Sequence, residues 1–137
     1  MQQGVERDPL PDGMSDVRAR LIAAAREFNR GRYFEAHEVL EDALDEVPDE
    51  LWELFTGLIQ ISVGYHKATQ ELWSGAARML ASGLGKIDAY PSGTAGLDLN
   101  ALCARVGRDV AALRGREFDL TAFRIKPPRL RFQNSRQ

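Results

Sequence analysis

Residues 54–68 read LFTGLIQISVGYHKA, and this stretch decides the fold that the sequence predicts. When the surrounding segment is plotted as a helix, its strongly polar residues fall on one narrow strip, namely Glu53, Gln60, Lys67 and Glu71. Gly57 and Gly64 lie beside this strip, and such small residues let a neighbouring helix approach closely. We therefore expect a helix over residues 49–72 to be the central element of an all-α bundle.

Four further helices are predicted around this central one. Apolar residues recur at helical spacing over residues 17–29, 34–47 and 74–90, and again after Asp98 as far as Gly115. Residue types that cap helix starts precede or begin these stretches: Ser15 or Asp16, Asp49, Ser74 and Asp98. No strand pattern competes, so the prediction is a single-domain, all-α bundle of about five helices.

The two ends of the chain differ from the bundle in composition. Residues 1–14, MQQGVERDPLPDGM, lack the basic start and apolar stretch of a signal peptide and predict a flexible lead. The bundle domain is expected over residues 15–125, and its last part is predicted to be an extended segment packed on the helices. Pro127 and Pro128 forbid further helix, and residues 126–137 form a basic tail.

Composition excludes several classes of protein. The 137 residues are 44% apolar and 28% charged with a formal net charge of -2, as in a soluble globular domain. The most apolar run, residues 54–65, is shorter than the roughly 20 residues that span a bilayer, so no membrane segment is expected. The single Cys103 excludes an internal disulfide framework and a cysteine-based zinc site. A reducing compartment, the cytoplasm, is therefore expected.

A weak internal repeat is visible at a spacing of forty residues. EAHEVLEDAL at residues 35–44 and GAARMLASGL at residues 75–84 share one alanine and two leucines in register. Two copies of a helical hairpin produce such a match, and so does coincidence between helices that pack alike. In its spacing and its alanine and leucine pattern, the pair resembles tetratricopeptide repeats, which favours a helical interaction or assembly module with no catalysis.

Charge is strongly segregated along the chain. Nine acidic residues and no Lys or Arg lie between Tyr33 and His66. A solvated helix face explains this block, and the alternative is a negative surface that attracts cations or a basic protein partner. Five cations and no acid follow Asp119, so the tail is expected to fold back on the acidic block of its own chain or of a second subunit in a homo-oligomer. RNA binding by the tail is the less favoured alternative, and no nucleic-acid partner is expected.

Three residues are candidate metal ligands. His37 and Glu41 are four apart and face the same side of one helix, and an antiparallel neighbouring helix brings His66 toward them. Two imidazoles and one carboxylate suit zinc with an open position, or non-haem iron. HE-x-x-E resembles the HE-x-x-H helix of metalloproteases, with Glu38 at the position of the base that deprotonates metal-bound water. The alternative is that both histidines are neutral and each donates one hydrogen bond.

Three segments resemble one known family: FNRGRYFEAHEVLEDAL at residues 28–44, LFTGLIQISVGYHKA, and SGAARMLASGLGKIDAYP at residues 74–91 followed by GLDL. They are similar to the domain-of-unknown-function 309 family of small bacterial and archaeal proteins, over about residues 20–100. The resemblance implies an all-helical bundle and the family's label of predicted metal-dependent hydrolases.

The same resemblance gives weight to particular side chains: Glu35, His37, Glu38, Glu41, Gln60 and His66. Many relatives are expected to carry a second His or a Trp near positions 65 and 46, where this chain has Tyr65 and Glu46. Tyr65 and Ser62 complete the candidate pocket. Ser62 and His66 are also spaced for acyl transfer, although this spacing on a helix leaves poor room for an oxyanion hole.

Overall fold

The computed structural model describes residues 15–115 and Leu130, and over these residues it contains five α-helices, two short 3-10 helices and no strand. In chain order the elements are α1 (Ser15–Asn29), α2 (Tyr33–Ala43), η2 (Leu44–Glu46), α3 (Asp49–Thr69), α4 (Trp73–Ile87), η3 (Thr94–Gly96) and α5 (Leu99–Arg114). The predicted all-α fold is confirmed. The predicted N-terminal lead, the extended segment up to residue 125 and the basic tail apart from Leu130 lie outside the described residues.

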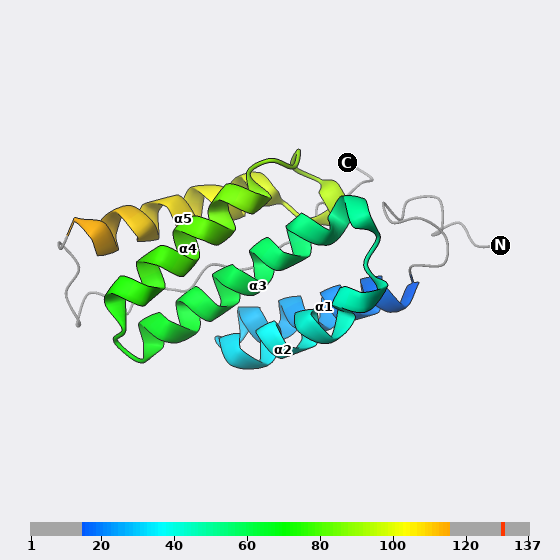
Figure 1. Cartoon of the computed structure of the whole chain (residues 1–137), viewed down its shortest axis with the longest axis horizontal. Coiled ribbons are helices and arrows are strands. Elements are labelled where there is room, and N and C mark those ends of the chain that lie inside the picture. Colours follow the sequence, from blue (N-terminus) through cyan, green and yellow to red (C-terminus); the bar gives the residue numbers. More distant parts are fainter. Residues whose placement is uncertain (1–14, 116–129, 131–137) are drawn as a thin grey trace.

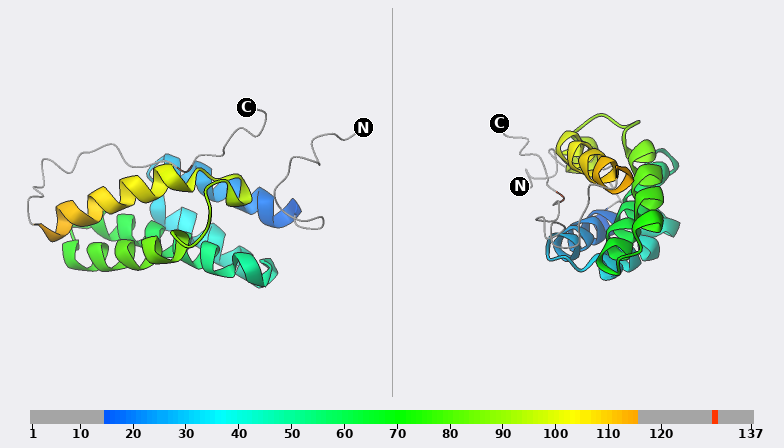
Figure 2. Two further views of the ribbon diagram at one scale, coloured as in Figure 1. Left: turned by 90° about the horizontal axis from the view of Figure 1, so that it is seen from above. Right: turned by 90° about the vertical axis from the view of Figure 1, so that its left-hand side faces the viewer.

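The helices pack in chain order, each mainly against the next: α1 on α2, α2 on α3, α3 on α4 and α4 on α5 (Figure 1). Seen end on, they form an arc with α1 and α5 toward its two ends and the α3–α4 hairpin in the middle (Figure 2). The prediction that α3 is central is confirmed, because it is the longest helix and packs on both α2 and α4.

In the α3–α4 hairpin the backbones of the two helices approach each other closely at glycine residues. A Cβ added at Gly83 would lie 2.6 Å from the carbonyl oxygen of Gly57 and 2.7 Å from Cγ1 of Ile61. A Cβ added at Gly64 would lie 2.7 Å from Cγ of Leu80. The small residues that mark α3 in the sequence therefore have a steric cause, since a larger residue here would push the two helices apart.

The α1–α2 and α3–α4 turns have the same geometry, forty residues apart. In the first turn the Gly31 N–H bonds the Phe28 carbonyl at 2.9 Å and the Arg32 N–H bonds the Glu27 carbonyl at 2.9 Å. In the second turn, the N–H groups of residues 71 and 72 bond the carbonyls of residues 68 and 67, both at 3.0 Å. The residue before each second helix also has nearly the same backbone angles, φ -94° and ψ 72° at Arg32 against φ -92° and ψ 73° at Leu72.

Helix boundaries differ from expectation at several places. α3 ends at Thr69, not at residue 72. After Ala43, α2 gives way to the 3-10 turn η2 ahead of Pro48. The predicted cap Ser74 lies inside α4, where its hydroxyl accepts from Nη1 of Arg78 at 3.1 Å. α4 ends at Ile87, not at Tyr90. The Asp98 cap is confirmed, since its carboxylate accepts the Ala101 N–H at 3.2 Å. Within the described residues, none of the helices has the length and apolar character needed to cross a bilayer.

Candidate functional site

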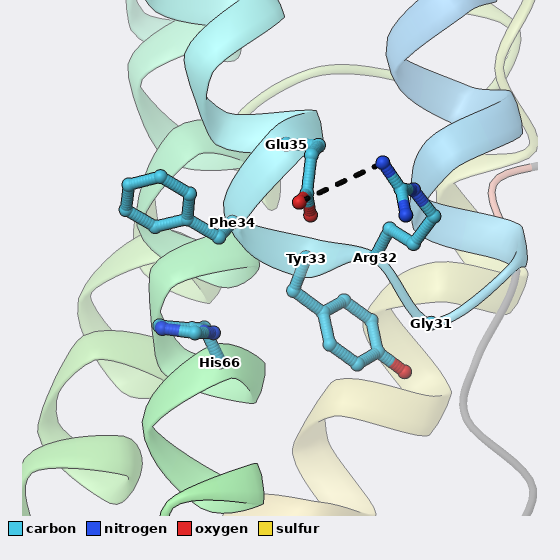
Figure 3. A pocket seen from close by; sticks show the side chains of 6 residues that line it. All are labelled: Gly31, Arg32, Tyr33, Phe34, Glu35 and His66. Atoms are coloured by element: carbon cyan, nitrogen blue, oxygen red, sulfur yellow. Dashed lines mark ion pairs between the residues drawn. The ribbon is translucent and has the colours of Figure 1, made fainter.

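An open pocket of about 520 Å³ lies at the start of α2 (Figure 3). It is lined by residues of the α1–α2 turn and of α2 together with one residue of α3: Gly31, Arg32, Tyr33, Phe34, Glu35 and His66. Arg32 closes one side, with Nε 2.6 Å from Oε1 of Glu27 and Nη2 3.7 Å from Oε2 of Glu35. Two of the predicted site residues, Glu35 and His66, therefore line the same pocket.

Phe34 connects the two histidines of the chain. Its ring centroid lies 5.1 Å from that of His37 on the next turn of α2 and 5.3 Å from that of His66 on α3. Phe34 is nevertheless 44% exposed, which is unusual for so large an apolar side chain. In Figure 3 the Phe34 and His66 rings lie on the same side of the start of α2. The sequence prediction missed Phe34, although its position three residues before His37 placed it on the same helix face.

The proposed metal ligands come together only in part. Nε2 of His37 lies 3.6 Å from Oε1 of Glu41, and Nδ1 of His37 is 3.0 Å from the Phe34 carbonyl oxygen. The second histidine, His66, contacts the Phe34 ring. Across the described residues, no group of three or more His, Cys, Asp and Glu side chains is placed to hold a metal ion. The structure thus pairs His37 with Glu41 without assembling the three-ligand site.

The other predicted residues face different surroundings. Glu38, the proposed base, is exposed on α2. Gln60 accepts a hydrogen bond from the Ser82 hydroxyl at 3.0 Å, across the α3–α4 hairpin. Ser62 is buried, and its hydroxyl donates to the Leu58 carbonyl of its own helix at 3.0 Å. These side chains do not converge with the histidine pair.

Tyr65 points into the core toward α5. Its hydroxyl donates to Oδ2 of Asp109 at 2.6 Å, and Nε of Arg105 donates to the same oxygen at 3.2 Å. Burial, reinforced by the Asp109 carboxylate, raises the pKa of Tyr65. The sequence prediction overlooked Asp109, and the available signal was an acid within the apolar stripe of α5, four residues after an arginine. This buried network fixes the position of α5 against α3.

Asn29 and Leu130 form a contact that joins distant parts of the chain. The Leu130 N–H donates to Oδ1 of Asn29 at 2.7 Å, and Nδ2 of Asn29 donates to the Leu130 carbonyl at 3.1 Å. The Leu130 side chain is 5% exposed and belongs to the hydrophobic core. No local sequence pattern indicates a contact across 101 residues, although Leu130 stands out as an apolar residue among the cations of the tail.

The architecture defines a small all-α protein of consecutively packed helices with an exposed aromatic side chain beside an open pocket. Residues 21–79 match the family described as "Domain of unknown function (DUF309)", which confirms the resemblance seen in the EAHE and GLIQ segments. The matched region covers α2 and α3 with most of α1 and the first half of α4, and it ends before the expected residue 100. None of the curated proteins matches the chain.

Proposed function

We propose that the chain is a helical interaction module without catalysis of its own, which binds a positively charged polypeptide through the Phe34 surface. This surface consists of Phe34, His37, Glu38 and Glu41 of α2 and His66 of α3. The observation that carries the proposal is the 44% exposure of Phe34 beside an open pocket of about 520 Å³. Exposed aromatic side chains next to a pocket are typical anchor points of protein interfaces.

The charge of α2 supports a basic partner. The helix and the segment that follows it carry only acids among their charged residues up to His66, and Glu38 and Glu41 are exposed next to Phe34. A negative field of this kind raises the association rate with a positively charged partner and disfavours acidic ones. An apolar side chain flanked by Lys or Arg is therefore the chemistry expected of the bound segment.

The matched turns support a structural analogy with helical-hairpin repeat proteins. Two hairpins with the same turn hydrogen bonds follow each other at a spacing of forty residues. Tetratricopeptide repeats use a spacing of about 34 residues, and such stacked hairpins present side chains to partner proteins. The analogy concerns the arrangement of helices, while the Phe34 surface supplies the proposed specificity.

Photo-crosslinking from position 34 tests this function. A photoreactive amino acid placed at position 34 in the producing cell should give a crosslinked partner that is absent when the same group replaces Trp52. Trp52 is the matched control because it is also 44% exposed. The partner should then bind the purified chain at least ten times more weakly after Phe34→Ala, and binding should weaken with added salt.

Two results would contradict the proposal. One is the same set of crosslinked proteins from positions 34 and 52. The other concerns the affinity for the purified partner. The proposal fails if this affinity is unchanged in Phe34→Ala and in the double variant Glu38→Lys, Glu41→Lys but is reduced in Trp52→Ala.

A second candidate function is cation binding at the His37–Glu41 pair. The observation in its favour is the orientation of His37: with Nδ1 directed at the Phe34 carbonyl, Nε2 faces the Glu41 carboxylate. Metal-bound histidines commonly donate their second ring N–H to a backbone carbonyl in this way. Only two of the three proposed ligands come together, so the set of ligands is incomplete for a hydrolytic zinc or iron site. We therefore assign no reaction step to Glu38.

Elemental analysis of protein purified without chelator tests this second candidate. It requires zinc or iron near one per chain, reduced in both His37→Ala and His66→Ala if all three ligands bind it. A content that is unchanged in His37→Ala would contradict it, and a metal lost in His37→Ala but kept in His66→Ala would leave His66 outside the site.

The cytoplasm is the compartment that we propose for either function. Cys103, the single cysteine, is a partly buried free thiol. Burial and then the neighbouring Asp88 charge raise the pKa of this thiol, which keeps it in its less reactive protonated form. A chain whose only thiol is structural is compatible with a reducing compartment.

A further inference from the structure

The outer faces of α1 and α2 carry opposite charge. On α2 the exposed stripe of the Phe34 surface consists of Phe34, Glu38 and Glu41. On α1 two exposed arginines lie four residues apart, Arg26 in the last turn and Arg30 directly after the helix. Among residues 15–115, neither arginine forms an ion pair. The α1–α2 hairpin therefore presents an acidic half and a basic half.

Both halves lie on the same outer side of the hairpin. The two helices pack side by side at one end of the arc, and Nη1 of Arg20 on α1 donates to the Asp42 carbonyl of α2 at 2.7 Å (Figure 1). Each charged stripe lies on the side of its helix that is opposite to the buried residues. These buried residues are Leu21, Ala24 and Phe28 on α1 and Tyr33, Ala36 and Leu40 on α2. The acidic and basic stripes thus form one continuous two-helix face.

Such a face is complementary to a second copy of itself. A two-fold axis that runs along the hairpin lays α1 of each copy over α2 of the other. In this arrangement the arginines oppose the acids in both contacts. A two-fold axis across the hairpin would instead lay α1 on α1 and oppose like charges. Charge complementarity therefore selects the first arrangement.

The first arrangement also covers Phe34. Because a short turn joins the end of α1 to the start of α2, rotation about the long axis of the hairpin keeps these two ends at the same level. Arg26 and Arg30 of the second copy then lie over Phe34 and Glu38. An arginine side chain stacks on aromatic rings and pairs with carboxylates, so the same cations match both neighbours.

We propose that the positively charged polypeptide bound by the Phe34 surface is the end of α1 of a second copy, in a symmetric dimer with two such contacts. Each copy supplies Arg26 and Arg30 to the Phe34 surface of the other. This inference rests on the proposed function and names its partner.

Two double variants of the full chain test the arrangement by sedimentation equilibrium. Arg26→Glu, Arg30→Glu makes both halves of the face acidic, and Glu38→Lys, Glu41→Lys makes both halves basic. Each variant alone should dimerise at least about ten times more weakly than the unaltered chain. An equimolar mixture of the two should recover the dimer, because both contacts between unlike chains then pair acids with cations.

The matched control is Arg108→Glu, Arg114→Glu. Both arginines are exposed on α5, at the other end of the arc, and their substitution changes the net charge by the same amount. This control should dimerise as the unaltered chain does. Phe34→Ala should weaken the dimer at least about ten times, whereas Trp52→Ala should leave it unchanged. Circular dichroism checks that each variant keeps its helices.

Three results would overturn this inference. The first is an unaltered chain that stays monomeric up to about 1 mM. The second is a control that loses as much affinity as the α1 variant, which would show general charge attraction. The third is a mixture of the two swapped variants that stays monomeric or forms complexes larger than a dimer.

Failure of this inference is distinguishable from failure of the proposed function. A monomeric chain whose position 34 still crosslinks a different protein would exclude the second copy and leave the Phe34 surface in place. The same crosslinked proteins from positions 34 and 52 would exclude the Phe34 surface itself.

Discussion

Tyr33 lies where three helices meet in an aromatic cluster. Its ring centroid is 5.1 Å from that of Phe28 on α1 and 5.5 Å from that of Tyr65 on α3, while Phe28 and Tyr65 are 6.0 Å apart. In Figure 3 the Tyr33 ring is turned away from the Phe34 side, with its hydroxyl toward α5. Burial raises the pKa of Tyr33 to about 12, with a smaller opposing effect from Arg105.

This raised pKa predicts that stability falls in alkaline solution. An unfolded tyrosine ionises near pH 10, whereas folded Tyr33 keeps its proton until about pH 12, so between these values the unfolded chain binds fewer protons and is favoured. The contribution is fully present below pH 10 and is lost as pH rises to about 12. Urea unfolding at pH 9, 10 and 11 should show this decline, and Tyr33→Phe should make it shallower. Parallel declines in the two proteins would contradict the prediction.

Glu71 occupies a backbone conformation that favours glycine. Its φ is 64°, and the equivalent residue of the first turn is Gly31 with φ 81°. A side chain in this left-handed region costs about 1–2 kcal/mol. We therefore expect Glu71→Gly to raise the free energy of unfolding by up to about 1 kcal/mol, after the extra entropy of unfolded glycine is subtracted.

The matched substitution Gly31→Ala should lower the free energy of unfolding by about 1 kcal/mol. A Cβ at Gly31 would meet no atom within 4 Å, so the loss would reflect backbone conformation alone. Urea titrations of both variants measure the two changes. The prediction requires that the two substitutions change the free energy of unfolding in opposite directions. A lower free energy of unfolding in Glu71→Gly would mean that the glutamate side chain makes a stabilising contact that outweighs its backbone strain.

At the scale of the element, the α3–α4 hairpin depends on glycine where the backbones approach. Gly83→Ala would place a Cβ 2.6 Å from the Gly57 carbonyl oxygen, so we expect it to cost about 1–3 kcal/mol as the helices move apart. Gly85 is the control on the same helix, since a Cβ there would meet no atom within 4 Å. Gly85→Ala should stabilise α4 by about 0.5–1 kcal/mol. Thermal melts compare the pair, and an equal effect at the two positions would contradict the packing explanation.

The helices were predictable because their signal is local. Apolar residues repeat at helical spacing, and breakers such as Gly31 and Pro48 separate the stretches, so existence and order followed from neighbours in the sequence. The ends of the helices were predicted less accurately, since Leu72 rather than Ser74 precedes the first residue of α4. There the shape of the turn between two packed helices determines where the second helix begins. The presence of a favourable capping residue nearby, Ser74, does not determine it.

The site was predictable only as far as helix pairing. His37 on α2 and His66 on α3 each contact the Phe34 ring, which follows from the packing of these two helices. Whether side chains converge depends on the rotation of each helix about its axis, which periodicity fixes only coarsely. The direction of Tyr65 toward Asp109 and the contact of Asn29 with Leu130 depend on residues 44 and 101 positions away, for which the sequence holds no local pattern.

At the scale of the whole molecule, packing in chain order makes the middle of the arc the best protected part. α3 contacts both α2 and α4, and eleven of its residues are buried, whereas α1 and α5 each pack mainly on one neighbour. Amide hydrogen exchange should therefore be slowest within residues 55–65 and faster in α1 and α5. Mass spectrometry of exchanged peptides measures this order. Slowest exchange in α1 or α5 would mean that the ends of the arc stabilise one another more than their packing indicates.

The twin turns have a consequence for engineering. Residues 27–36 and 67–76 make the same backbone hydrogen bonds at the same offsets, so the two turns follow the same backbone path. A graft of the first turn would supply glycine in place of Glu71. It would also put phenylalanine at Ala68, which is 1% exposed in the core, so Ala68 has to be kept. In a longer chain of hairpins the backbone of this joint could be reused, whereas its buried side chains would have to be fitted to each pair of helices.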